Sequence, residues 1–166
     1  CDLGRAAERA SATSRRVATE TGLAGAGRSV VAVGLDMAAA HLGPWEATRV
    51  LIVGTGAYAG ATVSTLHALG ASDVSVYSTS GRAREFAEGR GIGWVSAADL
   101  PSALERADLV VTCRGLGSPV LTRDMAAQAG RTVVLDLALM RDTESSIASL
   151  SNVTLIDLPT IQASVP

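Results

Sequence analysis

Two glycines stand where a buried strand would turn into a helix. Gly54 and Gly56 follow the apolar run 49–53, and Ala59 comes three residues later, which fits G-x-G-x-x-(G/A). In such a turn the first glycine allows a tight bend, the second lets the backbone approach a pyrophosphate, and a small third residue permits close helix packing. The following helix N-terminus would face the phosphates. A dinucleotide site is therefore predicted, with packing alone as the alternative. The residues of this turn are Gly54, Thr55, Gly56, Ala57, Tyr58 and Ala59.

The end of the next strand distinguishes NAD from NADP. An NAD site usually places an acidic residue there to bind the ribose 2′-OH. The segment 76–84 has no acid, and Asp73 stands at the opposite end of that strand. Hydroxyl groups can bind a 2′-phosphate and arginine can neutralise it, so NADPH is the predicted cofactor. A solvated helix face is the alternative role for the arginines. The side chains concerned are Ser78, Thr79, Ser80, Arg82 and Arg84.

Cys113 is a candidate for chemistry, because it follows the fourth strand, where a doubly wound sheet binds its ligand. It would be either a nucleophile or part of the cofactor pocket. No basic partner other than Arg114 is evident, which favours the pocket. The cofactor site is accordingly extended to Thr112, Cys113, Arg114 and Gly115.

Other polar residues give weaker signals. His41 and His67 fit surface or packing positions better than a general base. Asp136 and the segment 140–142 form a polar cluster near the same sheet edge, for which an ion pair and a functional role are equal alternatives. The sequence therefore assigns no catalytic residue and no metal ligands.

Composition is typical of one compact domain. The chain has 166 residues, 48% of them hydrophobic, and 14 Lys plus Arg against 16 Asp plus Glu, so any polyanion would be bound only locally. Two cysteines are too few for a disulfide framework, and no apolar run approaches the roughly 20 residues of a spanning helix. A cytoplasmic protein without membrane contact is expected.

Short apolar runs alternate with helical patterns along the chain. This alternation predicts a Rossmann-like α/β fold, a doubly wound parallel sheet with helices on both faces, preceded by a linker helix. Strands are expected over 49–53, 73–78, 94–95, 109–112, 132–137 and 153–156, and helices over 2–20, 29–42, 57–69, 82–88, 98–106 and 122–129.

Several stretches together resemble the glutamyl-tRNA reductase family, NADPH enzymes that start tetrapyrrole synthesis. "SRRVATETG" is similar to the family's K-R-V-R-T-E-T segment, "SVVAVGLDMA" to its S-V-S-x-x-A-V-x-L-A helix, and "VLIVGTGAYA" to its V-L-V-I-G-A-G-E-M-(G/A) loop. "ADLVVTCRGLGSPVLT" resembles A-D-I-V-I-S-S-T-G-A-x-x-P-V-I-T, and "VLDLALMRD" resembles L-I-D-I-A-V-P-R-D. The motifs occur in the family's order over nearly the whole chain.

The chain departs from the family pattern at four places. Ala57 and Tyr58 replace Glu-Met, Arg114 replaces Thr, Met140 replaces Pro, and "STS" at 78–80 replaces N-R-T. The last change removes the family's usual arginine, so Arg82 would have to substitute for it. Arg114 would either crowd the nicotinamide side or bind phosphate.

The resemblance implies a division of the chain. Residues 1–28 would be a linker helix from a catalytic domain, and residues 29–166 the NAD(P)-binding Rossmann domain. The family's T-C-N-R-x-E motif with its nucleophilic cysteine does not occur, and neither Cys1 nor Cys113 matches it. Both that N-terminal domain and a C-terminal dimerisation helix are expected to be missing, so this fragment would bind cofactor without catalysis.

The resemblance also implies an activity for the whole enzyme. It would reduce glutamyl-tRNA with NADPH to glutamate-1-semialdehyde for porphyrin and heme biosynthesis, binding tRNA mainly through the missing domains and forming a homodimer through the missing helix. Two alternatives stay open: the nucleotide domain of a shikimate dehydrogenase-like oxidoreductase, and a stand-alone NADP-sensing regulatory protein.

Overall fold

The computed structural model describes residues 30–114, 119–138 and 140–164. The chain divides into two compact units, and the elements below belong to the second, residues 31–166. The predicted helix over 2–20 and Gly115 of the predicted site lie outside the described residues.

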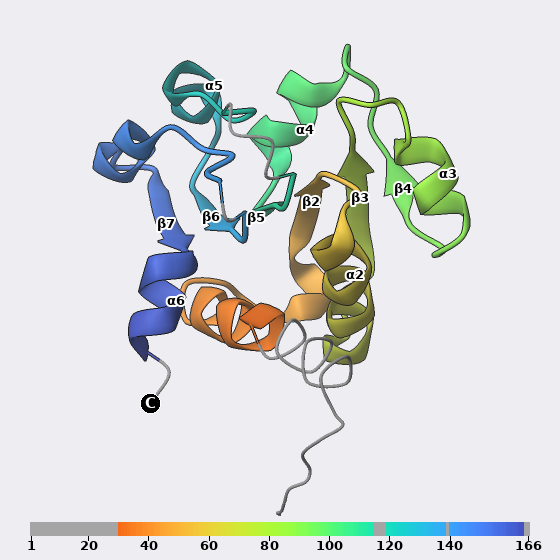
Figure 1. The fold of residues 1–166 in the computed structure, drawn as a ribbon, viewed down its shortest axis with the longest axis horizontal. Helices are drawn as coiled ribbons and strands as arrows, with labels where there is room; N and C mark the ends of the chain where they lie inside the picture. The colour runs from red at the N-terminus through yellow and green to blue at the C-terminus, as the bar shows by residue number, and fades with distance from the viewer. Residues whose placement is uncertain (1–29, 115–118, 139, 165–166) are drawn as a thin grey trace, which may run out of the picture. The chain divides into compact units, whose positions relative to one another are not determined.

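The unit is built on one parallel sheet of six strands in the order β4-β3-β2-β5-β6-β7 (Figure 1). The order reverses between β2 and β5, which is the switch point of a doubly wound sheet and the place where such sheets bind ligands. The predicted fold class is therefore confirmed. The strands are β2 (Arg49–Val53), β3 (Asp73–Tyr77), β4 (Gly93–Trp94), β5 (Leu109–Thr112), β6 (Thr132–Asp136) and β7 (Val153–Asp157).

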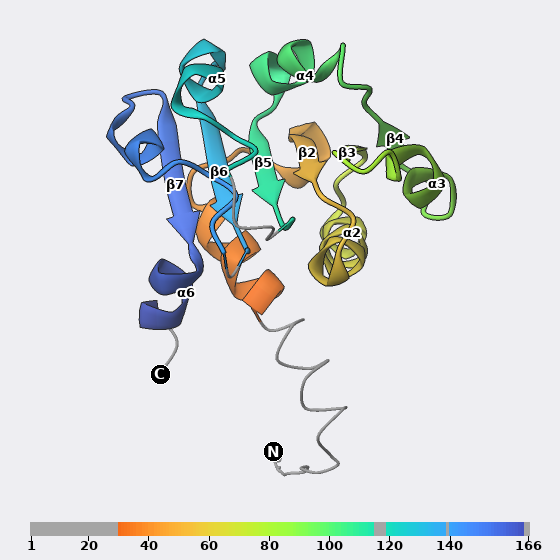
Figure 2. The same ribbon diagram turned by 45° about the horizontal axis from the view of Figure 1, so that its top comes forward.

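Helices cover both faces of this sheet, as predicted. In Figures 1 and 2, α4 and α5 lie on one face, while α2, α6 and the helix that ends at residue 39 lie on the other. The labelled helices are α2 (Ala57–Leu69), α3 (Ala83–Glu88), α4 (Leu100–Arg106), α5 (Arg123–Gln128) and α6 (Leu158–Ser164); the 3-10 turns are η1 (Trp45–Ala47) and η2 (Ser145–Ser149).

The central strands β2, β5 and β6 are buried on both faces, which explains why their sequences are nearly continuous apolar runs. On one face Leu51 and Val110 belong to a buried cluster with Leu104 of α4 and Ile147 of η2. On the other, a Cβ added to Gly34 would lie 3.0 Å from Leu135 and 3.2 Å from Ile161 of α6. Gly34 thus lets its helix pack closely against β6 and α6.

One helix was missed by the sequence analysis. Helix α6 begins directly after β7, where the Asp157 carboxylate accepts hydrogen bonds from the Thr160 backbone N–H at 3.1 Å and its hydroxyl at 2.7 Å. Asp157 with Pro159 in the first turn is the ordinary signature of a helix start. The other predicted elements that fall on described residues differ from the structure only near their ends. Among the described residues no helix has the length and apolarity that a membrane span requires.

Candidate functional site

Gly54 is required by the fold itself. Its φ is +114°, in the region that favours glycine. A Cβ at this position would lie 3.0 Å from the backbone nitrogen of Arg114 and 3.1 Å from the carbonyl carbon of Cys113. The tight turn after β2 and the close approach of the β5 loop therefore both depend on Gly54, whether or not a ligand is present.

Gly56 has no comparable structural reason. Its φ of −77° suits any residue, and an added Cβ would meet only the Cys113 carbonyl oxygen, at the ordinary distance of 3.4 Å. Gly56 is exposed and caps α2 without a side-chain hydrogen bond, and the first turn carries no acid. Ala59 behind it is fully buried, as helix–sheet packing predicts. An open helix N-terminus beside bare backbone suits a phosphate.

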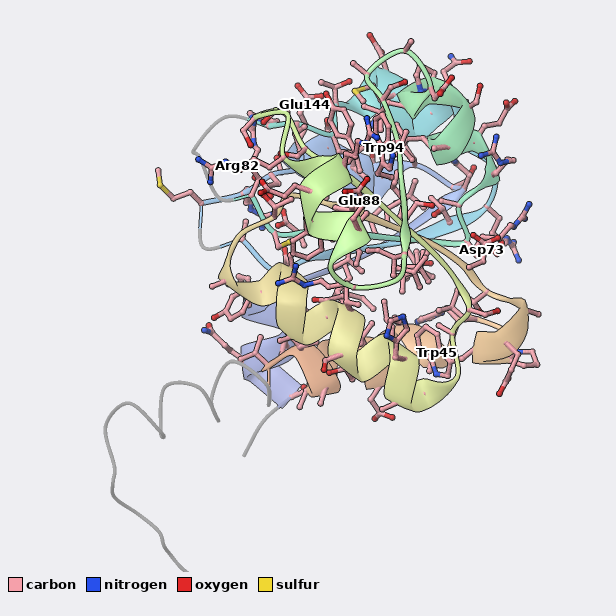
Figure 3. All side chains as sticks on the ribbon, turned by 90° about the vertical axis from the view of Figure 1, so that its right-hand side faces the viewer. Trp45, Asp73, Arg82, Glu88, Trp94 and Glu144 are labelled. Carbon is pink, nitrogen blue, oxygen red and sulfur yellow. The ribbon has the colours of Figure 1, made fainter. Side chains whose placement is uncertain are left out.

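The carboxyl end of β3 carries hydroxyl groups and no acid. The hydroxyl groups of Ser78 and Ser80 form a hydrogen bond of 2.8 Å, and the Ser80 backbone N–H donates to the Ser78 hydroxyl at 3.2 Å. Asp73 begins β3, so it lies at the opposite edge of the sheet from Arg82, as Figure 3 shows. The segment directly after β3 therefore carries no carboxylate that would repel a 2′-phosphate.

The two candidate arginines after β3 differ in their surroundings. Arg84 is exposed and pairs at 3.1 Å with Glu88 one helical turn later, which is the solvated-face alternative. Arg82 is exposed and is the N-cap residue that precedes α3. Arg82 is thus the better placed of the two toward the loop of residues 78–80.

Arg114 joins two loops. Its Nε lies 3.7 Å from Oδ1 of Asp142, its backbone N–H donates to that carboxylate, and its Nη1 donates to the Thr79 hydroxyl at 3.5 Å. The Asp142 side chain is completely buried and that of Arg114 is 15% exposed. The guanidinium therefore connects the end of β3 with the loop after β6.

The polar cluster predicted after β6 is a buried network. One oxygen of Asp136 accepts from the Ala138 backbone N–H at 3.0 Å, while the other accepts from the Asp142 N–H at 3.2 Å and the Thr143 hydroxyl at 2.8 Å. These bonds fix the loop that carries Asp142. The arrangement favours the ion-pair alternative for residues 140–142, with Asp142 as the partner of Arg114 and Arg141 paired separately with Asp157 at 2.8 Å.

Cys113 is a poor nucleophile in this environment. Burial, followed by the charges of Asp142 and Asp136, raises the pKa of its thiol from 9.0 to about 12. The thiol instead faces the carbonyl oxygens of Val53 and Gly54, at 3.6 and 3.8 Å. Cys113 therefore lies against the glycine turn as a neutral side chain, which agrees with the pocket-lining interpretation. Thr112 beside it is fully buried, and within the described part its hydroxyl has no hydrogen-bond partner.

The two histidines lie away from this edge. His41 lines a hollow of about 600 Å³ together with Asp108, Arg131 and Asn152. This hollow lies at the amino ends of the strands, which we call the amino edge of the sheet. His67 is exposed on the last turn of α2. Among the described residues no three His, Cys, Asp or Glu side chains converge as a metal site would require. A second hollow of about 600 Å³ lies between Pro119, Met140 and Thr143. It adjoins the carboxyl ends of the strands, which we call the carboxyl edge of the sheet.

The structure therefore brings together the glycine turn, residues 78–80, Cys113 and Arg114, at the switch point of the sheet. The segment 140–142 was predicted near this edge, but the contact of Asp142 with Arg114 was not, because the two residues lie 28 positions apart.

The family described as Shikimate / quinate 5-dehydrogenase matches residues 36–164, which include every described element of the site. The chain belongs to this family. Together with the doubly wound sheet, membership identifies a domain that takes a nicotinamide dinucleotide.

Similar proteins agree with the resemblance seen in the motifs. The chain is 46% identical over 171 residues to the glutamyl-tRNA reductase of Clavibacter michiganensis subsp. michiganensis, an alignment covering 99% of this chain and 39% of that protein. The resemblance to glutamyl-tRNA reductases is thereby confirmed. The chain thus spans well under half the length of this relative.

Two solved structures have the same fold. The glutamyl-tRNA reductase from Methanopyrus kandleri superposes with a TM-score of 0.73 at 22% identity, covering 98% of this chain and 40% of that one. A chain described as the nucleotide binding domain of glutamyl-tRNA reductase from Thermoplasma volcanium gives a TM-score of 0.61 at 19% identity, covering 81% of this chain and 88% of that one.

Proposed function

We propose that this chain is the NADPH-binding part of a glutamyl-tRNA reductase. The whole enzyme would reduce glutamyl-tRNA to glutamate-1-semialdehyde for tetrapyrrole synthesis. The observation that carries the proposal is the 46% identity to such an enzyme over 99% of this chain. Residues 29–166 would form the cofactor domain and residues 1–28 its connection to the rest of the enzyme.

The residues present fit a dinucleotide. The α2 N-terminus has no side-chain cap and an exposed glycine, which suits a pyrophosphate. The acid-free end of β3, with the hydroxyls of residues 78–80 and the cation of Arg82, supports NADPH over NADH. When bound, the cofactor supplies a hydride.

The chain's own contribution is to bind and orient the cofactor. Residues of the glycine turn would hold the phosphates, and the neutral thiol of Cys113 would line the pocket without attacking the substrate. The acyl chemistry and most tRNA contacts would belong to other parts of the enzyme, since the chain has a net charge of only −2 and no strong basic surface is expected. A homodimer is likewise proposed for the whole enzyme.

Titration of the protein with NADPH and NADH tests the proposal. Tighter binding of NADPH is expected, and Gly56→Asp should abolish binding because its carboxylate would face the pyrophosphate. Gly43→Asp is the matched control, since a Cβ there has open space and Gly43 lies at the amino edge. Failure to bind either dinucleotide, or unchanged binding in Gly56→Asp, would contradict the proposal.

Shikimate or quinate oxidation is the second candidate, because the matching family carries that description. It predicts turnover of shikimate or quinate with NADP by the enzyme that contains this chain. Reduction of glutamyl-tRNA by that enzyme, without turnover of shikimate or quinate, would decide for the reductase.

A further inference from the structure

Arg114 reaches across the glycine turn. It follows β5, whereas Thr79 follows β3, and β2 lies between these two strands in the sheet. A side chain from the β5 loop that contacts the Thr79 hydroxyl at 3.5 Å must therefore pass the carboxyl end of β2. This is where the open N-terminus of α2 and Gly56 are found. The guanidinium thus stands at the same edge as the proposed phosphate groups.

Residue 79 carries a hydroxyl group and no charge of its own, whereas residue 114 is an arginine. The contact between the Arg114 guanidinium and the Thr79 hydroxyl brings the two positions together. A positive charge is therefore present beside residue 79, although it is supplied by a different strand.

We infer that Arg114 is the residue that selects NADPH, by placing its guanidinium against the adenosine 2′-phosphate beside Thr79. This inference rests on the proposed function. Asp142 acts as its positioning residue, because the buried carboxylate contacts both Nε and the backbone N–H of Arg114. Such fixing lowers the entropy that a long side chain loses when it binds phosphate.

Arg114 fits this role better than the arginines that follow β3. Arg84 is engaged with Glu88 in an exposed pair. Arg82 is exposed, so water screens its charge. The Arg114 side chain is only 15% exposed, and a charge-assisted hydrogen bond is stronger in such a setting.

The test separates the 2′-phosphate from the rest of the cofactor. Adenosine 2′,5′-bisphosphate and adenosine 5′-monophosphate are titrated calorimetrically into the protein and into Arg114→Gln, which keeps a donor toward Asp142. The variant is expected to bind the bisphosphate about tenfold more weakly or worse, with unchanged binding of the monophosphate. Arg131→Ala removes an arginine that lines the hollow at the amino edge and should change neither.

A second variant distinguishes recognition from structural support. Adding Thr79→Arg to Arg114→Gln returns a cation beside the site, so preference for the bisphosphate should return. If Arg114 had only a structural role, Arg114→Gln would weaken the binding of both probes alike, and adding Thr79→Arg would restore neither. Either of those results, or a preference lost in Arg82→Gln but kept in Arg114→Gln, would overturn the inference.

Failure of the inference differs from failure of the proposed function. If the unaltered protein binds NADPH more tightly than NADH, and Arg114→Gln does so to the same degree, the proposed function stands and Arg114 is not the selecting residue. If the unaltered protein binds neither dinucleotide nor either adenosine phosphate, both are rejected.

Discussion

Two arginine–aspartate pairs lie at opposite edges of the same sheet. At the amino edge Asp108 accepts from Arg49 through the backbone N–H at 2.8 Å, Nε at 3.1 Å and Nη2 at 3.3 Å, and the two side chains are 51% and 32% exposed. At the carboxyl edge the Nε of Arg114 lies 3.7 Å from an Asp142 carboxylate that is completely buried. The two pairs therefore differ above all in their exposure to water.

This difference has a consequence for stability. An exposed pair is well hydrated even when broken, so it contributes little to the free energy of unfolding. A buried pair has lost its water and is destabilising unless its contacts are good. At the carboxyl edge the largely buried Arg114 contacts both Asp142 and Thr79, so removing a partner there should cost more stability than removing one at the amino edge.

The largest expected effect concerns the thiol beside the buried pair. Burial raises the pKa of Cys113 to about 12, so at pH 8 the folded protein should react with iodoacetamide about a thousandfold more slowly than the protein unfolded in guanidinium chloride. The reaction is followed by mass spectrometry in a Cys1→Ser variant, so that one thiol remains. Equal rates in the two states would show that Cys113 is accessible as thiolate.

The sign of the pH dependence follows from the same shift. The folded pKa lies above the unfolded value of 9.0, so this contribution to stability is complete below pH 9 and is lost as the pH rises toward 12. The free energy of unfolding of Cys1→Ser should therefore fall over that range more than that of Cys1→Ser with Cys113→Ala. Parallel pH profiles would contradict the raised pKa.

Removing each aspartate compares the two edges directly. Asp142→Ala leaves the largely buried Arg114 without its carboxylate and should lower the free energy of unfolding by about 3 kcal/mol or more. Asp108→Ala, which breaks the exposed pair, should cost less than about 1 kcal/mol. Urea titrations followed by circular dichroism measure both. Similar losses would mean that burial does not distinguish these pairs.

Gly54→Ala tests how tightly the carboxyl edge is packed. The added Cβ would meet the Arg114 backbone at 3.0 Å in a conformation of φ +114°, and we expect a loss of about 3 kcal/mol. Gly81→Ala is the matched control, because Gly81 has φ +77° but nothing within 4 Å of the new Cβ, so strain alone should cost about 1 kcal/mol. Equal melting temperatures for the two variants would show that the β5 loop moves away without cost.

The sequence predicted the frame of the site well for a physical reason. Strands β2 and β5 were placed with the bounds they have in the structure, because continuous apolar runs between glycine or polar residues identify doubly buried strands. Gly54 was explained correctly as a turn residue, although its contact with Arg114 was not foreseen. Helix α6 was missed although Asp157 and Pro159 carry its signal, because seven residues give little periodicity.

The contacts within the site were not predictable in the same way. Arg114 lies 28 residues from Asp142 and 35 from Thr79, and such pairings depend on strand order and side-chain direction. The sequence alone left residues 140–142 undecided between an ion pair and a function. Only the arrangement in space of the segments that follow β5 and β6 and of the end of β7 shows that Asp142 pairs with Arg114 while Arg141 pairs with Asp157.

The smallest expected effect is the acid sensitivity of the amino edge. Burial alone would raise the pKa of Asp108, but the hydrogen bonds and charge of Arg49 outweigh it and the pKa falls below 3.8. Stability from this pair is therefore present above the unfolded pKa and lost as the pH falls through the folded one. Asp108→Asn should be less stable than the unaltered protein by at most about 1 kcal/mol at pH 7. Urea titrations from pH 7 to pH 3 should show this stability difference closing below pH 4 and becoming smaller in 1 M salt. A difference that depends on neither pH nor salt would show that it comes from lost hydrogen bonds and not from the charge of Asp108.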